Sequence, residues 1–316
     1  SWLPERISSM SQIYIYSPSG AVRDKAAFRR GLRVLTQMGH DTVVDPDALA
    51  SSTRFAGDDE TRIAAIARAA ASGSHASLIA RGGYGLTRLL PNLPYRAIQK
   101  SIDRGMSWVG FSDFTALQLA VLARTGAITW AGPALCDSFG APEVDEIMQA
   151  CFDDLMLAQG EGAGWRMGVA AARELPRRKP GVWAKDAMLW GGNLSVLCSL
   201  IGTPYLPGIE GGILFLEDVA EHPYRIERMI SQLLHAGVIQ RQKAIVLGQF
   251  TDFKLTPHDR GFGLPAVVRW LRSQTRVPVL TDLPFGHVPT RVCLPVGARV
   301  DLLVEGRDAM LVWGHI

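Results

Sequence analysis

The segment with the clearest chemical potential is Gly110-Phe111-Ser112-Asp113, which ends an apolar run and leads directly into a helical pattern. A serine on a sharp strand-to-helix turn presents its hydroxyl above a sheet, beside free helix N–H groups that favour developing negative charge. Ser112 is therefore a candidate nucleophile. Residue 114 is Phe where the usual G-x-S-x-G elbow has glycine, and a simple helix N-cap is the alternative interpretation of Ser112.

A second loop, residues 81–85 with the sequence RGGYG, follows another apolar run. Its glycines allow the backbone to approach a ligand closely and to direct N–H groups at it. The loop lacks the G-K-[ST] and G-x-G-x-x-G spacings of phosphate-binding loops. It is either a tight turn, or the source of one amide of an oxyanion hole whose other amide belongs to Asp113.

A serine nucleophile needs a base and a group that orients the base. Among seven histidines, His287 lies in a rigid apolar loop, LPFGHVP at residues 283–289, which suits an oriented base but also a structural histidine. Glu217 ends the apolar run 212–216, and a buried carboxylate there must be paired. It could orient an imidazole, or it could pair with an arginine such as Arg225.

The elements that must position these residues alternate between strand and helix in the first half of the chain. Strict alternation predicts parallel strands with right-handed crossovers, hence an α/β layered domain whose ligands bind beyond the carboxyl ends of its strands. The loops 82–85 and 110–113 then share one rim. We expect strands at residues 12–16, 41–44, 75–80, 106–111 and 127–131, and helices at 24–38, 58–71, 114–124 and 144–158.

The second half of the chain has a different residue pattern, in which Gly and Pro separate short strand-like runs. We expect a nucleophile-bearing domain at residues 1–160, a linker at 161–180, and a C-terminal domain of mixed β and α structure at 181–316 that carries Glu217 and His287. The strand candidates are residues 212–216, 244–249, 277–280, 300–304 and 310–312, and the helix candidates are 224–236 and 264–273.

The amino-acid composition limits the kinds of protein that this chain can be. The chain has 316 residues, 47% apolar and 20% charged, which is the balance of a folded protein large enough for two domains. Its net charge of +3 is spread along the chain, so we expect no nucleic-acid partner. Residues 1–6 begin no charged leader and no long apolar run follows, so we expect no membrane span and a cytoplasmic location. The four cysteines and the histidines show no metal-binding spacing.

Together these segments resemble the LD-carboxypeptidase family, also called muramoyltetrapeptide carboxypeptidases. Six motifs occur in order along nearly the whole chain: SPSG at 17–20, ARGGYG at 80–85, GFSD at 110–113, GGNLS at 191–195, FLED at 215–218 with PYRI at 223–226, and GH at 286–287. The resemblance implies a triad of Ser112, Glu217 and His287 split between two domains, and an oxyanion hole of the Gly83 and Asp113 amides. The family pattern does not require the last glycine of the elbow.

The resemblance also implies a reaction. It would be hydrolysis, through an acyl-enzyme and without a cofactor, of the amide between an L-configured centre and the terminal D-alanine of a murein tetrapeptide during cell-wall recycling. A homodimer is a further implication. Such an enzyme must bind a free carboxylate, for which arginine is the usual partner. Arg81 lies near the expected rim, where a structural role fits it equally well, and Asn193 is a comparable candidate.

Two other functions fit the same residues. A peptidase resembling the microcin C resistance proteins would share the triad but cleave aminoacyl-nucleotide conjugates, and it would need an aromatic platform such as Trp183 or Trp190. A non-catalytic two-domain protein that binds small peptides would show saturable binding without turnover, and its Ser112 would be unreactive.

Overall fold

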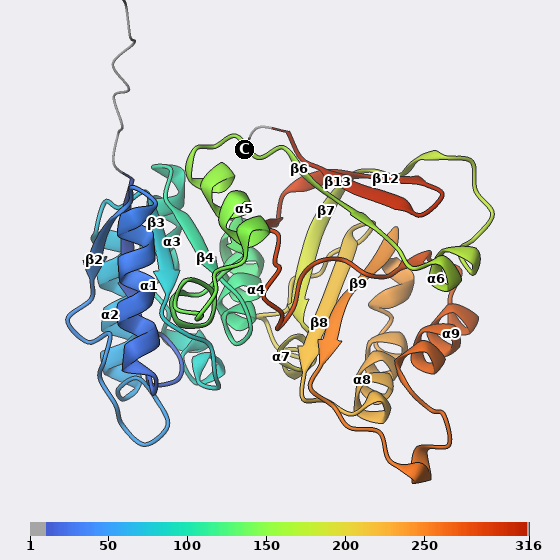
Figure 1. Cartoon of the computed structure of the whole chain (residues 1–316), viewed down its shortest axis with the longest axis horizontal. Helices are drawn as coiled ribbons and strands as arrows, with labels where there is room; N and C mark the ends of the chain where they lie inside the picture. Colours follow the sequence, from blue (N-terminus) through green and yellow to red (C-terminus); the bar gives the residue numbers. More distant parts are fainter. Residues whose placement is uncertain (1–10, 315) are drawn as a thin grey trace, which may run out of the picture.

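A computed structural model of the chain describes residues 11–314 and residue 316. The expectation about a leader concerns residues 1–6, which lie outside the described residues. Within the described part, no helix combines the length and apolar character needed to cross a bilayer. Figure 1 shows two layered halves side by side, each built around its own sheet. This arrangement confirms the expected fold class.

The first sheet has six strands in the order β11-β5-β4-β3-β1-β2. The five strands from the N-terminal part of the chain pair in parallel, whereas β11 (Leu294–Val296) arrives from far along the chain and pairs antiparallel with β5. The other strands are β1 (Gln12–Tyr16), β2 (Asp41–Val44), β3 (Ala76–Ile79), β4 (Ser107–Gly110) and β5 (Thr129–Ala131).

Helices cover both faces of this sheet, so its strands are apolar on both sides. In β1, Tyr14 and Tyr16 pack into one cluster, while Ile13 and Ile15 pack into another with Phe28. The first cluster takes in residues of α2 (Asp59–Ala71), α3 (Tyr95–Asp103) and α4 (Phe114–Thr125), and the second takes in residues of α1 (Lys25–Gln37), the π-helical turn η3 (Leu135–Phe139) and α5 (Glu146–Met156). Short 3-10 turns, η1 (Leu86–Arg88) and η2 (Leu90–Asn92), follow the glycine loop.

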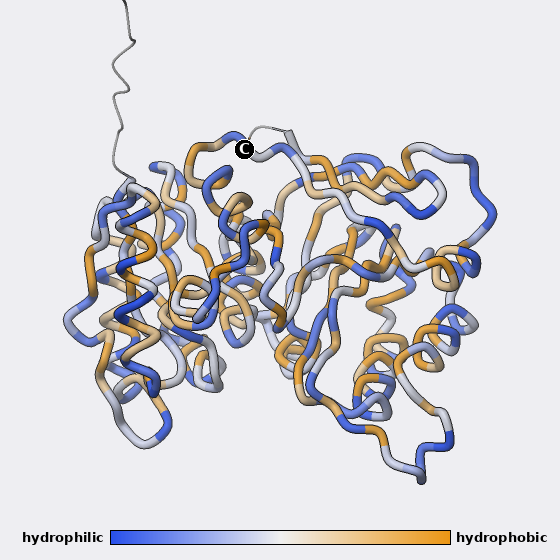
Figure 2. The backbone as a smooth tube through the Cα atoms, in the orientation of Figure 1, coloured by the Kyte–Doolittle hydropathy of each residue, from blue (hydrophilic) through white to orange (hydrophobic). Residues whose placement is uncertain are grey.

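Helix α1 illustrates how the pattern produces the packing. Hydrophilic and hydrophobic residues alternate around it (Figure 2), and the buried ones, Ala27, Phe28, Gly31 and Leu35, recur at helical spacing. The Asp24 side chain caps its first turn by accepting a hydrogen bond from the Ala27 amide at 2.9 Å.

The second sheet has seven strands in the order β10-β9-β8-β7-β12-β13-β6. From β7 to β10 the pairs are parallel, and from β7 through β12 and β13 to β6 they are antiparallel. The strands are β6 (Gly162–Arg166), β7 (Gly181–Asn193), β8 (Ile213–Val219), β9 (Ala244–Thr251), β10 (Val279–Leu280), β12 (Arg299–Glu305) and β13 (Asp308–Val312). The helices are α6 (Val169–Arg173), α7 (Leu194–Ser199), α8 (Pro223–His235) and α9 (Leu264–Gln274), with 3-10 turns η4 (Ile239–Arg241) and η5 (Pro257–Asp259).

The two halves are not simply successive along the chain. Strand β6 and helix α6 lie within the expected linker, and β6 forms an edge of the second sheet, so the irregular stretch is confined to residues 174–180. Conversely, β11 lies within the expected C-terminal domain but extends the first sheet. The boundaries at residues 160 and 180 remain a prediction.

Candidate active site

Ser112 lies at the carboxyl end of β4 with a backbone φ of +66°, in the left-handed region that non-glycine residues seldom adopt. The N-cap of α4 is Asp113, with no side-chain hydrogen bond to the helix. The Ser112 hydroxyl is instead directed at His287, 3.1 Å from its Nε2 atom. The structure therefore favours the elbow interpretation of Ser112 over the simple N-cap.

The glycine loop lies against this serine, because β3 and β4 are neighbours and end at the same rim. A Cβ atom added to Gly82 would lie 2.9 Å from Cβ and 3.0 Å from Oγ of Ser112. The Gly82 carbonyl accepts a hydrogen bond from the Gly20 amide at 3.1 Å, which fixes the loop from the other side. Only glycine at position 82 allows this close approach.

The predicted oxyanion donors are the amides of Gly83, which follows the glycine beside Ser112, and of Asp113, which follows Ser112 itself. Within the described part of the chain, neither amide has a hydrogen-bond acceptor, which leaves both available to a ligand. The Asp113 side chain is buried, and its Oδ2 accepts hydrogen bonds from the Ser19 hydroxyl at 2.7 Å and the Leu86 amide at 2.9 Å. Burial raises the pKa of this carboxyl. The Asp113 side chain thus links its own loop to the segments that contain Ser19 and Leu86. The oxyanion role of the Asp113 amide remains a prediction.

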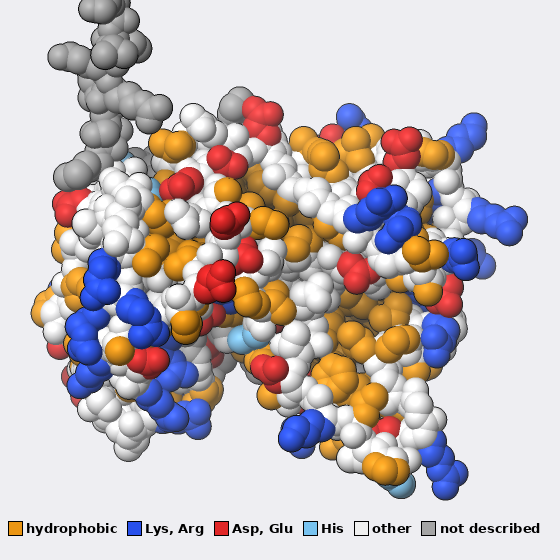
Figure 3. All heavy atoms as spheres, in the orientation of Figure 1, with side chains coloured by type: hydrophobic (Ala, Val, Ile, Leu, Met, Phe, Trp, Pro, Cys, Tyr) orange, Lys and Arg blue, Asp and Glu red, His pale blue; other side chains and the backbone are white. Residues whose placement is uncertain are grey.

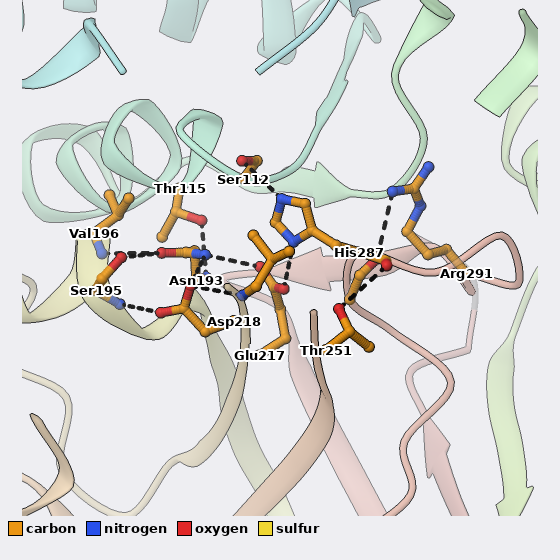
Figure 4. A network of polar contacts seen from close by, with 12 residues as sticks. Ser112, Thr115, Asn193, Ser195, Val196, Glu217, Asp218, Thr251, His287 and Arg291 are labelled. Atoms are coloured by element: carbon orange, nitrogen blue, oxygen red, sulfur yellow. Dashed lines mark hydrogen bonds and ion pairs between the residues drawn. The ribbon is translucent and has the colours of Figure 1, made fainter. Parts of the chain in front are cut away.

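His287 connects the serine to the second sheet (Figure 4). Its Nδ1 atom lies 2.8 Å from Oε2 of Glu217, and its ring packs on Phe111 with centroids 4.9 Å apart. Gly286 has φ +149°, and a Cβ added there would lie 2.9 Å from the Gln249 carbonyl oxygen. The glycine before the imidazole therefore lets the loop lie directly on β9.

Glu217 is buried near the end of β8, with both carboxyl oxygens in use. Oε2 faces His287, and Oε1 accepts a hydrogen bond from Asn193 Nδ2 at 3.2 Å. Because a carboxylate only accepts, His287 donates through Nδ1, which leaves Nε2 to accept the proton of the Ser112 hydroxyl. The three predicted triad residues thus form one continuous chain of hydrogen bonds, which is the geometry that a nucleophile, base and orienting acid require. Their catalytic roles remain a prediction.

Asn193 occupies a position that sequence reasoning assigned wrongly as a candidate for a substrate carboxylate. Its Nδ2 donates to Glu217 and, at 3.1 Å, to Asp218, and its Oδ1 accepts from the Ser195 hydroxyl and the Val196 amide. Both N–H groups and both acceptor positions of the side-chain amide therefore have hydrogen-bond partners within the protein. The signal was present in the sequence, because an Asn directly before a helical run is a typical N-cap.

Asp218 is the second residue that sequence reasoning missed. Its buried carboxylate accepts hydrogen bonds from Asn193, from the Ser195 amide at 2.9 Å and from the Val219 amide at 2.8 Å. Burial raises the pKa of Asp218 to about 6, and the neighbouring Glu217 contributes to the rise. Two adjacent buried carboxyl groups therefore share one asparagine as a donor.

The same asparagine joins the two halves of the molecule. Its backbone amide donates at 3.0 Å to Oγ1 of Thr115, in the first turn of helix α4, which follows Ser112 and its N-cap Asp113. A Cβ added to Gly192 would lie 2.6 Å from that oxygen, so glycine is needed where β7 meets α4. The helix that follows Ser112 is therefore packed against the network that holds His287.

Arg291 is a further buried side chain beside the site. Its guanidinium lies 3.8 Å from the centroid of the Phe111 ring and donates to Asp137 at 3.0 Å, to Ser138 and to the Gly286 carbonyl. It thus supports both the aromatic ring under the imidazole and the loop that carries His287.

The site opens into two adjoining cavities, which share Asp137 and His287. One, of about 390 Å³, contains Ser112 and is lined by the charged residues Arg23, Asp24, Arg81 and Asp137. The other, of about 830 Å³, begins at His287 and has an acidic wall, defined as Asp137, Glu143, Asp145 and Glu146. In Figure 3, Lys and Arg side chains gather over α1 and Asp and Glu side chains over the region of α5, with a hollow between them.

Neither tryptophan proposed as a platform for a nucleotide base borders the serine cavity. Trp190 is buried, with its Nε1 hydrogen-bonded to Gln242 at 3.0 Å, and Trp183 donates to the Lys179 carbonyl in a separate pocket. Among the described residues, no group of three or more His, Cys, Asp or Glu side chains could hold a metal ion.

Comparison with known families gives two matches that together span most of the chain. Residues 13–132 match the family model for the LD-carboxypeptidase N-terminal domain, and residues 186–302 match that for the LD-carboxypeptidase C-terminal domain. Ser112 lies in the first match, and Glu217 and His287 lie in the second.

Individual relatives give the same picture. The chain is 33% identical over 230 residues to the murein tetrapeptide carboxypeptidase of Pseudomonas aeruginosa, covering 69% of this chain and 68% of that one. It is 29% identical over 252 residues to the microcin C7 self-immunity protein MccF of Escherichia coli, covering 72% and 70%. The crystal structure of muramoyltetrapeptide carboxypeptidase from Oxalobacter formigenes superposes with a TM-score of 0.85 at 36% identity, covering 96% of this chain and 99% of that one.

Proposed function

Because this chain belongs to the LD-carboxypeptidase family, we propose that it is a serine carboxypeptidase that releases the terminal D-alanine from murein tetrapeptides during cell-wall recycling. The observation that carries the proposal is the chain of hydrogen bonds from Ser112 through His287 to Glu217, at 3.1 and 2.8 Å. The relatives named for murein peptides support the choice of substrate.

In the first half of the proposed reaction, His287 Nε2 takes the proton of the Ser112 hydroxyl as the serine oxygen attacks the carbonyl carbon before D-alanine. Glu217 stabilises the imidazolium that forms, through the hydrogen bond to Nδ1. The amides of Gly83 and Asp113 donate to the oxyanion of the tetrahedral intermediate, and each such donor is typically worth about 3 kcal/mol.

In the second half, His287 returns its proton to the departing D-alanine nitrogen, and an ester between Ser112 and the tripeptide remains. A water molecule then gives its proton to the same Nε2 atom and attacks the ester carbonyl. Collapse of the second intermediate releases the tripeptide acid, and the proton returns to Ser112. The balance is one amide and one water converted to one carboxylic acid and one amine.

The immunity-type peptidase is the second candidate, supported by the similarity to MccF. Such an enzyme would use the same triad on an aminoacyl-nucleotide conjugate. The positions of Trp183 and Trp190 outside the serine cavity weigh against it here, because they leave the nucleotide base without the platform predicted from the sequence.

The test combines turnover with labelling of the serine. The purified full chain is incubated with a murein tetrapeptide and, separately, with an acyl-sulfamoyl adenosine, and the products are identified by mass spectrometry. We expect D-alanine release from the peptide only. A serine-directed phosphonate should modify Ser112 alone, and Ser112→Ala should abolish release. Ser107→Ala, at the other end of β4, is the matched control and should remain active.

Either of two results would reject the proposal. One is activity retained by Ser112→Ala, and the other is saturable peptide binding with no turnover, as expected of a non-catalytic peptide-binding protein. Faster turnover of the nucleotide conjugate would instead identify the immunity-type function.

We further propose a cytoplasmic location and a homodimer, which rest on composition and on the family resemblance respectively. Light scattering after size-exclusion chromatography tests the second proposal, since a homodimer of this 34.4 kDa chain has twice that mass.

A further inference from the structure

Arg81 is a charged side chain at the wall of the serine cavity. It is half-buried, and the one hydrogen bond that it makes to the described residues runs from Nη1 to the Ala21 carbonyl at 3.0 Å. Among the described residues, no carboxylate lies within ion-pair distance of it. Removing a cation from water without a partner is costly, so such a group is usually completed by an anion.

The surroundings of Arg81 reinforce this need for an anion. Burial lowers the pKa of its guanidinium, and the nearby charge of Arg23 lowers it further. Asp137 attracts it from a distance but is already paired with Arg291 at 3.0 Å. Asp24, which also borders the cavity, uses its Oδ1 to cap α1.

The guanidinium lies beside the reacting centre. A Cβ added to Gly83 would lie 3.0 Å from Nη2 of Arg81, and one added to Gly20 would lie 3.2 Å from its Cζ. Two glycines thus make room for the guanidinium next to the peptide whose amide is the proposed oxyanion donor. In a C-terminal amino acid, two atoms, N and Cα, separate the carboxylate carbon from the scissile carbonyl carbon, so the two carbons lie about 3 to 4 Å apart.

On the other side of His287, negative side chains repel an anion. Beyond His287 the neighbouring cavity presents the acidic wall, on which Asp145 is held by hydrogen bonds from Thr290 at 2.6 Å and from the Met148 amide. A substrate carboxylate would be repelled there and attracted at Arg81. Both arginines that line the two cavities lie on the serine side, so the charges around the site favour a terminal carboxylate at Arg81 over one beyond His287.

We propose that Arg81 forms the carboxylate subsite of the cleft, binding the terminal carboxylate of the leaving amino acid through its free guanidinium N–H groups. The inference rests on the proposed carboxypeptidase function and names the group that would make the enzyme act at a chain end. Arginine suits the role because its planar fork matches the two oxygens of a carboxylate.

Binding to the full chain carrying Ser112→Ala tests the subsite without turnover. Isothermal titration calorimetry compares a murein tetrapeptide ending in D-alanine with the same peptide ending in D-alaninamide. We expect the acid to bind about 10- to 100-fold more tightly than the amide, the range of one lost hydrogen-bonded charge pair. Adding Arg81→Met should remove that preference by weakening the acid alone, and Arg81→Lys should restore part of it.

Arg33→Met, which removes an exposed charge from α1, is the matched control and should leave both affinities unchanged. Equal affinity for acid and amide before any change at Arg81 would overturn the proposal without relying on a variant. So would an equal loss for both peptides in a folded Arg81→Met protein, because that result indicates a structural role in the loop.

Turnover separates this inference from the function on which it rests. Release of D-alanine by the wild-type chain, with equal binding of acid and amide, would reject the subsite alone. No release of D-alanine, with acid-selective binding that depends on Arg81, would reject the carboxypeptidase function while keeping the carboxylate subsite.

Discussion

The two halves of the site are held in place by different means. On the first sheet, Ser112 is positioned by backbone conformation: its φ is +66°, and Gly82 approaches it so closely that a methyl group would not fit. On the second sheet, His287 is positioned by buried polar side chains, through Glu217 and Asn193. The serine half depends on a tight steric fit between Gly82 and Ser112, and the histidine half depends on the hydrogen bonds that hold Glu217.

This contrast fits the roles that we propose for Ser112 as nucleophile and His287 as base. A nucleophile needs its oxygen at a fixed point, which a strained elbow provides without further polar groups. A base gains a positive charge during the reaction, so its surroundings must stabilise an imidazolium. A buried carboxylate does this, provided that its other oxygen also accepts a hydrogen bond. The predictions below test the two halves separately.

The largest effect is expected for Glu217→Gln. The glutamate accepts hydrogen bonds from both His287 and Asn193, and a glutamine must direct its own NH2 group at one of these two donors. The imidazole then loses its tautomer or its orientation. We expect kcat for D-alanine release to fall by about 10³- to 10⁴-fold.

Glu305→Gln, at the exposed end of β12, is the control for the charge change and should be fully active. A loss of less than about tenfold in a folded Glu217→Gln enzyme would contradict the role of hydrogen bonding in the histidine half.

Gly82→Ala tests the serine half. The added methyl would lie 2.9 Å from the Ser112 Cβ, which forces the serine or the loop to move. Since a displacement of about 1 Å at a reacting group costs about 100-fold in rate, we expect at least that loss in kcat/KM.

Gly208→Ala is the matched control, because a Cβ there meets nothing within 4 Å. Circular dichroism should report an unchanged fold for both variants. Full activity of Gly82→Ala would show that the serine half tolerates added volume.

Asn193→Ala tests the junction of the two halves. It removes the hydrogen bonds to the buried carboxyl groups of Glu217 and Asp218, and it removes the side-chain cap of α7. We expect a loss of about tenfold in kcat from the first effect and a loss of about 1 kcal/mol in the free energy of unfolding from the second.

Asp58→Ala removes the equivalent cap of α2, which accepts from the Thr61 amide at 2.8 Å, far from the site. It should lose less stability than Asn193→Ala, because no buried carboxyl group loses a donor, and it should retain full activity. Equal activity in the two variants would mean that Asn193 acts only as a helix cap.

The prediction with the smallest effect on activity concerns stability and pH. The pKa of Asp218 is raised from 3.8 to about 6, so between these values the native state holds a proton that the unfolded state has lost. Stability contributed by this group therefore falls as pH rises from about 4 to about 6, by up to about 3 kcal/mol.

Urea unfolding of the wild type and of Asp218→Asn at pH 4 and pH 7 measures this effect. The difference in the free energy of unfolding between the two proteins should shift in favour of the variant on going to pH 7. A difference that does not change with pH would contradict the raised pKa.

Much of the first half of the fold was predictable because its pattern is local. The elements expected at residues 12–16 and 41–44 are β1 and β2 with the same bounds, and other elements differ by one to three residues at their ends. The long strand β7 and the edge strand β6 were missed. Their segments are rich in glycine and interrupted by charge, and their partners lie far along the chain.

The site residues show the same division between local sequence patterns, which are recognisable, and contacts to distant parts of the chain, which are not. Ser112 and His287 were recognisable because each follows a glycine-containing apolar segment with a known chemical use. The distances between them depend on packing of the two sheets, which no local pattern contains. Arg291 and Asp218 were missed because their importance comes from partners more than twenty residues away, such as Asp137 and Asn193.

Strand β11 has a consequence for how freely the two sheets can move. The segment that carries His287 leaves the second sheet at β10, joins the first sheet as β11 and returns to the second as β12. The chain on either side of His287 is therefore fixed, by β10 to the second sheet and by β11 to the first. A rotation of one sheet away from the other would stretch this segment, so the segment limits how far Ser112 and His287 can separate.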